Sequence, residues 1–157
     1  MSLNWVMLSQ DGQSPVPLPQ EKMFFTQDAV KLVLDCNENG YPGNTGGHWE
    51  SKGTVHLSNQ RIIFIAQHPT HEFQSLNIPI LNLKQWKLEQ PWFGANYIEG
   101  VVLPVPNGGL KKGKVVLTFI EGGATEFTTI LHNLLERLSE TNEIPSHYES
   151  LPSYAPP

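Results

Sequence analysis

One segment of this chain has the periodicity of a helix, and it follows a long series of strand-like segments. Apolar side chains recur every three or four residues from Phe127 to Leu138 and form a single stripe. The pattern predicts an amphipathic helix that begins near Thr125 or Glu126 and ends around 139–142. A helix with one apolar face must bury that face, and the rest of the chain offers only strands. We therefore expect a mainly β, α+β fold in which the helix closes a β structure.

The strand-like segments alternate apolar and polar side chains, as half-buried strands do. The segments 53–57 and 61–66 are separated by a short polar turn and predict a hairpin. The expected strands cover 23–26, 30–35, 53–57, 61–66, 73–79, 84–90, 97–103 and 114–120. This order predicts an antiparallel sandwich of two sheets and about seven strands, although other α+β folds also fit it.

Residues 89–100 combine three aromatic residues with a proline and two glycines. Pro91 cannot donate a hydrogen bond within a sheet, and Gly94 permits a tight turn, so the chain is expected to reverse here. Trp92, Phe93 and Tyr97 around this turn favour a hydrophobic corner that plugs the end of the β core. The alternative is an exposed aromatic binding patch.

The same stretch carries a family resemblance. Gln90-Pro91, residues 93–98 and Gly100 resemble the hallmark of the GRAM domain in the WW-domain-binding protein 2 family. Motifs within 52–64 and 117–127 resemble that family's paired strands and helix entry, in the same order. The resemblance implies a pleckstrin-homology-like fold without known catalytic residues, and it selects this fold among the α+β alternatives.

Composition limits the classes of partner and compartment. A net charge of −5 argues against nucleic acid, because binding to phosphates requires a basic surface. Cys36 is the only cysteine, which excludes an intrachain disulfide and favours a reducing interior. The opening residues 1–8 lack the basic flank and apolar run of a signal peptide, and no segment approaches the roughly 18 apolar residues of a transmembrane helix. We expect a soluble intracellular protein.

Catalytic and metal sites find little support in the sequence. His68 and His71 are the only closely spaced histidine pair, and no second cluster of ligands lies near them. Cys36 has no local signature of a nucleophile and is expected to be a structural cysteine. The Gly-rich segments 43–47 and 107–109 lack the lysine and hydroxyl residue of a phosphate loop. We therefore expect no enzyme activity, no metal and no cofactor.

A possible lipid-binding cluster consists of Lys111, Lys112 and Lys114 around one turn. Pleckstrin-like and GRAM domains are associated with phosphoinositides, so the resemblance makes these lysines candidates for binding such head groups. An acidic chain opposes anionic membranes overall, although a local basic patch overcomes that repulsion. Solvated surface lysines are the alternative.

The C-terminal segment contains a short motif. Residues 143–157 are polar and rich in proline without a helical or strand period, which predicts disorder. Within them Leu151, Pro152, Ser153 and Tyr154 fit the Leu/Pro-Pro-X-Tyr ligand of WW domains. Proline favours the polyproline II conformation that an aromatic WW groove binds, with Tyr154 as the anchor. The family resembled has long tails with repeated motifs, whereas this chain has one copy.

The sequence thus predicts three parts: an N-terminal arm and Pro-rich linker (1–22), a GRAM or pleckstrin-like domain (23–141) and a disordered tail (142–157). The expected function is a non-enzymatic adaptor that presents residues 151–154 to WW-domain proteins, with HECT-type ubiquitin ligases first by resemblance. A transcription-coactivator-like role and a location in cytoplasm and nucleus also follow from the resemblance alone. The alternative function is a peripheral phosphoinositide-binding module.

Overall fold

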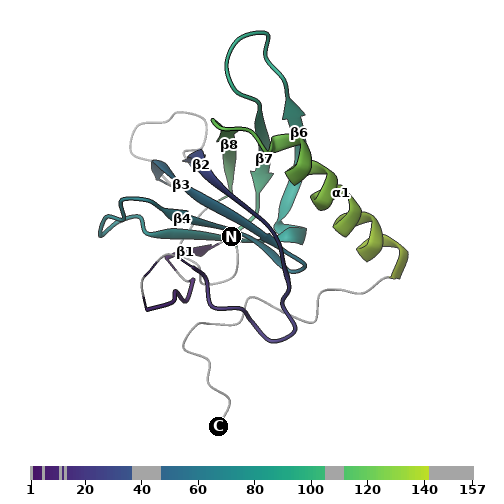
Figure 1. The fold of residues 1–157 in the computed structure, drawn as a ribbon, viewed down its shortest axis with the longest axis horizontal. Coiled ribbons are helices and arrows are strands. Elements are labelled where there is room, and N and C mark those ends of the chain that lie inside the picture. The colour runs from purple at the N-terminus through teal and green to yellow at the C-terminus, as the bar shows by residue number, and fades with distance from the viewer. Residues whose placement is uncertain are drawn as a thin grey trace.

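The computed structural model describes residues 2–4, 6–10, 12, 14–36, 47–104 and 112–141. The elements found in these ranges are β1 (Ser2–Leu3), β2 (Met23–Asp35), β3 (His48–Ser58), β4 (Arg61–Ala66), β5 (Ser75–Pro79), the 3-10 helix η1 (Ile80–Asn82), β6 (Leu83–Glu89), β7 (Tyr97–Val102), β8 (Gly113–Phe119) and α1 (Ala124–Thr141). The expected order of strands followed by one amphipathic helix is confirmed (Figure 1). The two segments expected at 23–26 and 30–35 are one continuous strand.

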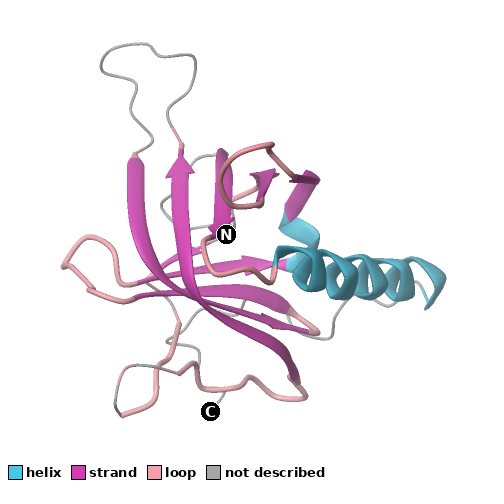
Figure 2. Cartoon of the chain, turned by 45° about the horizontal axis from the view of Figure 1, so that its top comes forward, coloured by secondary structure: helices cyan, strands magenta, loops and turns pink. Residues whose placement is uncertain are grey.

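The strands form one antiparallel sheet in the order β1-β5-β4-β3-β2-β8-β7-β6. The two layers expected from the sequence are therefore two halves of one hydrogen-bonded sheet that curls over the core. Figure 2 shows the long strands curving as they cross the molecule, with α1 lying to one side. β2 joins the halves, because it pairs with β3 along most of its length and with β8 from Val30 to Asp35.

Two irregularities in β2 allow it to pair with both halves of the sheet. Its register against β3 shifts between Met23 and Phe25 and again between Gln27 and Val30. At the second shift Ala29 has φ 56°, a left-handed conformation that is uncommon for residues other than glycine. Such bulges bend a strand and increase its twist. The bend separates the part of β2 that pairs only with β3 from the part that also pairs with β8.

The helix closes the core with the stripe seen in the sequence. Phe127 and Leu131 are fully buried, and Leu134 is nearly so. Phe127 contacts two rings of the sheet, with centroid distances of 5.8 Å to Phe25 and 5.5 Å to Phe119. Burying each large apolar side chain contributes about 1.5–3 kcal/mol as an upper estimate. These three rings fill the end of the core next to the first turn of α1.

The N-terminal arm packs against the sheet. β1 pairs with β5, and Val6 is buried against the outward-facing pair Ile63 and Ile65 of β4. The Oδ1 of Asn4 accepts hydrogen bonds from the backbone N–H groups of Gln74, in the β4–β5 connection, and Ser75, the first residue of β5. The arm therefore covers an edge and part of one face of the sheet.

The strand expected at 53–57 begins earlier than the sequence indicated. β3 begins at His48, and Trp49 lies opposite Leu34 in the β2–β3 ladder. Trp49 packs partly buried against the core. Glycine-rich sequence up to Gly47 obscured this start, because the strand's own alternation begins only where the glycines end.

Candidate interaction surfaces

The predicted WW ligand, Leu151 to Tyr154, lies outside the described residues, as does Lys111 of the lysine cluster. The other two lysines of that cluster are described. Lys112 is exposed just before β8, and Lys114 is the second residue of that strand. They lie at the end of β8 opposite the turn that leads into α1.

Lys114 belongs to a ladder of ion pairs across three strands. Its Nζ lies 3.3 Å from Oε2 of Glu99 on β7, whose Oε1 lies 3.3 Å from Nζ of Lys87 on β6. Lys87 also lies 3.2 Å from Glu89. Hydrogen bonds from Lys87 and then Lys114 lower the pKa of Glu99. Lys114 is therefore matched by a carboxylate, and Lys112 and Lys114 do not form an unbalanced basic pocket.

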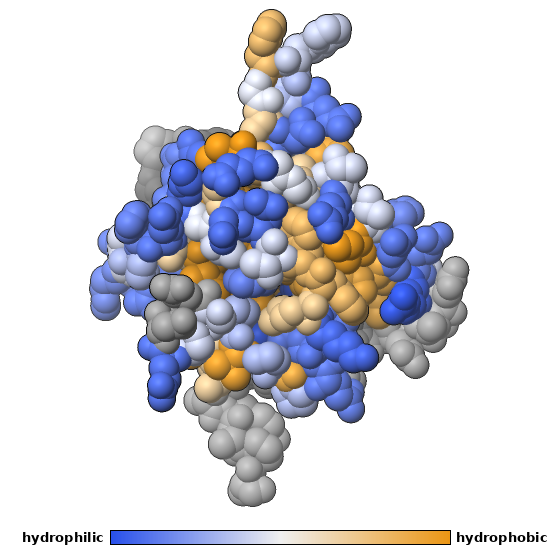
Figure 3. All heavy atoms as spheres, in the orientation of Figure 1, coloured by the Kyte–Doolittle hydropathy of each residue, from blue (hydrophilic) through white to orange (hydrophobic). Residues whose placement is uncertain are grey.

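The loop of residues 90–96, named here the aromatic loop, corrects the prediction of a hydrophobic corner. Trp92 is 97% exposed and Phe93 is 92% exposed. The loop extends beyond the sheet between β6 and β7 and stands out from the surface at the top of Figures 1 and 3. The core end where these rings were expected is already filled by Phe127 and its two partner rings. Of the two hypotheses, the exposed aromatic patch is the one observed.

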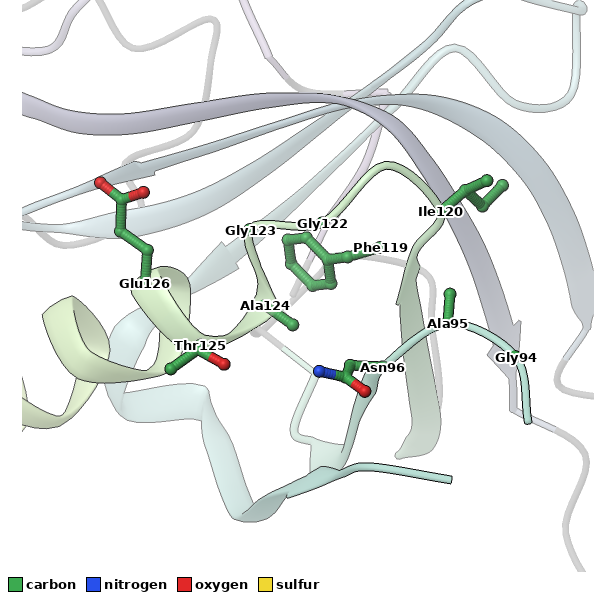
Figure 4. A pocket seen from close by; sticks show the side chains of 10 residues that line it. All are labelled: Gly94, Ala95, Asn96, Phe119, Ile120, Gly122, Gly123, Ala124, Thr125 and Glu126. Carbon is green, nitrogen blue, oxygen red and sulfur yellow. The ribbon is translucent and has the colours of Figure 1, made fainter. Parts of the chain in front are cut away.

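A hollow of about 470 Å³ lies between the aromatic loop and the start of α1. Its lining comes from residues 94–96, from the β8–α1 turn and from the first helical turn. In Figure 4 the Asn96 amide and the Phe119 ring point into this space, whereas Glu126 points away from it. No basic side chain is among the described residues that line the hollow. The N-terminus of α1 is therefore the only feature of the described lining that attracts an anion.

A second cleft, of about 820 Å³, separates the N-terminal arm from β2, β3 and β4. His56 lines it, and the Nδ1 of His56 lies 3.1 Å from Oγ1 of Thr26. The Nε2 of His56 is buried without a hydrogen-bond partner. Burial lowers the pKa of His56, against an opposing effect of Asp28. Burial therefore favours the neutral imidazole. Asp28 accepts a hydrogen bond from the hydroxyl of Thr54 at 2.9 Å.

The candidates for chemistry are separated in the fold. Cys36 is buried, and burial together with Asp35 raises the pKa of its thiol to about 11, which disfavours the reactive thiolate. His68 and His71 are exposed in the β4–β5 connection. Within the described ranges no three histidine, cysteine or acidic side chains are grouped to hold a metal. The helix that the structure describes is not long and apolar enough to cross a membrane.

Sequence reasoning missed one buried pair. Arg61, the first residue of β4, forms an ion pair with Glu21, and both side chains are almost entirely buried. The hydroxyl of Ser58 also donates to Glu21, at 2.6 Å. A charged residue directly before the apolar run 62–66 was the available signal at Arg61, but its partner lies 40 residues away. Arg61 is therefore not available to an external ligand.

The curled sheet closed by a C-terminal helix defines a pleckstrin-homology-like module. Its similarity to the Vps36 N-terminal PH domain supports this class, with a TM-score of 0.61 over 88% of this chain and 96% of that domain. The two sequences are 18% identical, so the likeness concerns the fold. No known protein-family model matches the chain.

Two curated proteins place the chain among its relatives. The UPF0664 stress-induced protein of Schizosaccharomyces pombe is 37% identical over all of this chain and 90% of its own length. WW domain-binding protein 2 of Homo sapiens is 33% identical over 87% of this chain. The chain belongs to the family of these two proteins, the WW domain-binding protein 2 family. It spans 54% of the human protein and most of the yeast one.

Proposed function

We propose that this protein is a non-enzymatic adaptor that binds WW domains through Leu151, Pro152, Ser153 and Tyr154. The observation that carries the proposal is membership of a family whose human relative is named for binding WW domains, in a chain that has a Leu-Pro-X-Tyr motif of its own. The motif follows α1 in sequence and lies after the last described residue, Thr141.

The chemistry of the motif suits a WW groove. Pro152 biases the backbone toward polyproline II, which lowers the entropy lost on binding, and the ring of Tyr154 supplies a large apolar anchor with a polar tip. A single copy lacks the gain in avidity that repeated motifs provide. The adaptor is therefore expected to bind an isolated WW domain with a dissociation constant of about micromolar order.

The partners proposed are WW-domain proteins, with HECT-type ubiquitin ligases as the first to test. The same proposal has the protein act in the cytoplasm and nucleus, and it includes a coactivator-like role as one consequence of adaptor function. The pleckstrin-like fold supports a binding module without catalysis, since the candidate nucleophile Cys36 is buried and its pKa is raised.

The test is calorimetric titration of the full chain against a panel of isolated WW domains. Wild type is expected to give saturable binding to at least one of them, and Tyr154→Ala is expected to abolish it. Tyr148→Ala is the matched control, because Tyr148 lies in the same segment but has Ser146 where the motif has Pro152. Binding that survives Tyr154→Ala, or no binding to any WW domain, would overturn the proposal.

A charge-reversal variant tests whether the lysine cluster takes part in WW binding. Lys111→Glu together with Lys112→Glu is expected to leave WW binding unchanged, because neither residue belongs to the motif. A loss of WW binding in this variant, with Tyr154 intact, would assign recognition to the domain surface.

A further inference from the structure

The aromatic loop leaves two adjacent large apolar side chains exposed to water. Trp92 and Phe93 are adjacent in sequence, and both are more than nine-tenths exposed. Single exposed apolar residues are common, but two large rings together at the end of a projecting loop mark an interaction site. Gly94, with φ 94° and no atom within 4 Å of an added Cβ, turns the chain in open space. Nothing within the described fold covers these rings.

The loop carries no charge that insertion into an apolar medium would bury. From Gln90 to Ile98 the sequence has no acidic or basic residue. The first charged side chains below it are Glu89 and Glu99, and Lys87 lies within 3.3 Å of both. The cost of desolvating charge is thus confined to the strands, where the carboxylates are already matched by an ammonium group.

The end of the loop that carries Trp92 and Phe93 is convex (Figure 3). The loop stands clear of the surface in Figure 3 and offers a tip, not a groove. Ile120, on the neighbouring β8–α1 turn, is 48% exposed and lines the same hollow as residues 94–96. Glu121 follows Ile120 and is exposed. An apolar tip with charged residues only below it fits a layered medium, in which apolar and polar regions lie at different depths.

We propose that the aromatic loop inserts into the interfacial layer of a lipid bilayer, with Trp92 and Phe93 at the boundary of head groups and acyl chains. Tryptophan concentrates at this boundary because its ring is largely apolar while its N–H finds a polar partner there. Phe93 adds apolar area, and the Lys87, Glu89 and Glu99 cluster is left at the level of the head groups.

This site differs from the lysine cluster in position and in chemistry. Lys112 lies at the β7–β8 end of the sheet, whereas the loop connects β6 to β7 at the other end. Insertion of uncharged rings depends on apolar contact and not on a negative head group. Binding is therefore expected on electrically neutral vesicles and is expected to be insensitive to salt. Two rings give weak, reversible binding, since stable anchoring takes a second signal.

The first experiment is co-sedimentation of the full chain with vesicles of phosphatidylcholine, and with vesicles that also contain phosphatidylserine. The double variant Trp92→Ala/Phe93→Ala is expected to weaken partitioning onto both kinds of vesicle by about tenfold or more. Met7→Ala is the control, because Met7 is also an exposed apolar residue but lies on the N-terminal arm. The melting temperature of the double variant is expected to match wild type, because the two side chains contribute little to the core.

The second experiment reads the environment of the ring itself. Wild-type tryptophan emission is expected to shift to shorter wavelength on addition of phosphatidylcholine vesicles and to be quenched by brominated acyl chains. Trp92→Phe keeps an aromatic ring, so it is expected to retain vesicle binding while losing the shift and the quenching. Trp5, Trp49 and Trp86 are present in both proteins, so the difference in emission between wild type and Trp92→Phe reports on Trp92. Trp49 and Trp86 are packed against the core.

Three results would overturn the inference. The first is a wild-type protein that binds neither kind of vesicle, which would indicate that the loop inserts into a pocket of a protein partner instead. Vesicle binding that requires phosphatidylserine and survives the double variant would assign binding to lysines. Binding without any change in tryptophan emission would place Trp92 outside the bilayer. Tyr154→Ala is expected to bind vesicles normally and the double variant to bind WW domains normally, which keeps this inference separate from the adaptor proposal.

Discussion

The guanidinium of Arg61 donates to the carboxylate of Glu21 through two hydrogen bonds, at 2.8 Å from Nε and 3.0 Å from Nη2, with both side chains almost entirely buried. The pair fastens the segment before β2 to the β3–β4 hairpin. Burial raises the pKa of Glu21, but hydrogen bonds from Arg61 and Ser58 outweigh it, and the net pKa lies below the ordinary value. The carboxylate therefore stabilises the fold above its ordinary pKa, and this stabilisation is lost as the pH falls through the lowered value.

Glu21→Gln is expected to lower the free energy of unfolding by about 3–5 kcal/mol, because it leaves the charge of Arg61 buried without a counter-ion. Urea denaturation at neutral pH measures this loss. Glu50→Gln is the comparison, since Glu50 is exposed on the sheet, where it lies 3.0 Å from His48 and 3.8 Å from Lys31. If both substitutions lower the free energy of unfolding by the same small amount, the buried pair contributes no more to stability than an exposed one.

His56 predicts a dependence of stability on pH. Burial lowers the pKa of His56 in the folded protein, so below about pH 6.5 the unfolded chain takes up a proton that the folded one does not. The free energy of unfolding is expected to be highest above that pH and to fall as the pH decreases toward the folded pKa. His56→Gln should flatten the slope in this window, whereas His132→Gln, on the exposed side of α1, should leave it intact. An unchanged slope in His56→Gln would contradict the assignment.

Gly53 permits the close approach of β3 and β4. A Cβ at this position would lie 2.0 Å from the backbone oxygen of Ile65, which cannot move without parting the strands. Gly53→Ala is expected to cost about 3 kcal/mol or more in thermal or urea denaturation. Gly100→Ala is the matched strand substitution, because its nearest obstacle is the flexible end of Leu83 at 2.9 Å, and it should cost less. The reverse order would refute this account of the contact.

Cys36 offers a direct probe of local opening. Its thiol is buried with a pKa raised to about 11, so roughly one thiol in a thousand is a thiolate at pH 8. A chromogenic disulfide reagent is expected to modify the native protein far more slowly than the chain in denaturant. Native and unfolded protein that react at similar rates would show that this end of β2 opens readily.

The elements of the fold were predictable because their signals are local. The alternation in β6 and the stripe from Phe127 to Leu138 each report burial within a few residues. The position of Trp92 was not predictable from the sequence. An apolar side chain prefers burial, but the sequence does not show whether the core has space for it. Phe25 and Phe119 already occupied that space, and they come from strands distant in sequence. The Glu21–Arg61 pair was missed for the same reason, since no local pattern couples these two positions.

The candidate sites also differ in whether they depend on neighbouring residues or on residues distant in sequence. A contiguous motif such as Leu151 to Tyr154 is readable without a fold, since its chemistry depends on neighbouring residues. The setting of Lys114 required the structure, because Glu99 and Lys87 approach it from two other strands. One feature of the sequence does indicate that the aromatic loop is exposed. It is the run of uncharged residues between Glu89 and Glu99, which contains Trp92, Phe93 and Gly94.

The central place of β2 has a consequence for the order in which the chain is made. β2 and β3 can pair early in synthesis. The second edge of β2 stays unpaired until β8 is made, since Lys31 lies opposite Thr118 of that strand. Until β8 and α1 leave the ribosome, the nascent chain holds an unpaired strand edge and an uncovered apolar face. Synthesis therefore passes through a state that is open to association with other chains, and the last strand and the helix end that exposure together.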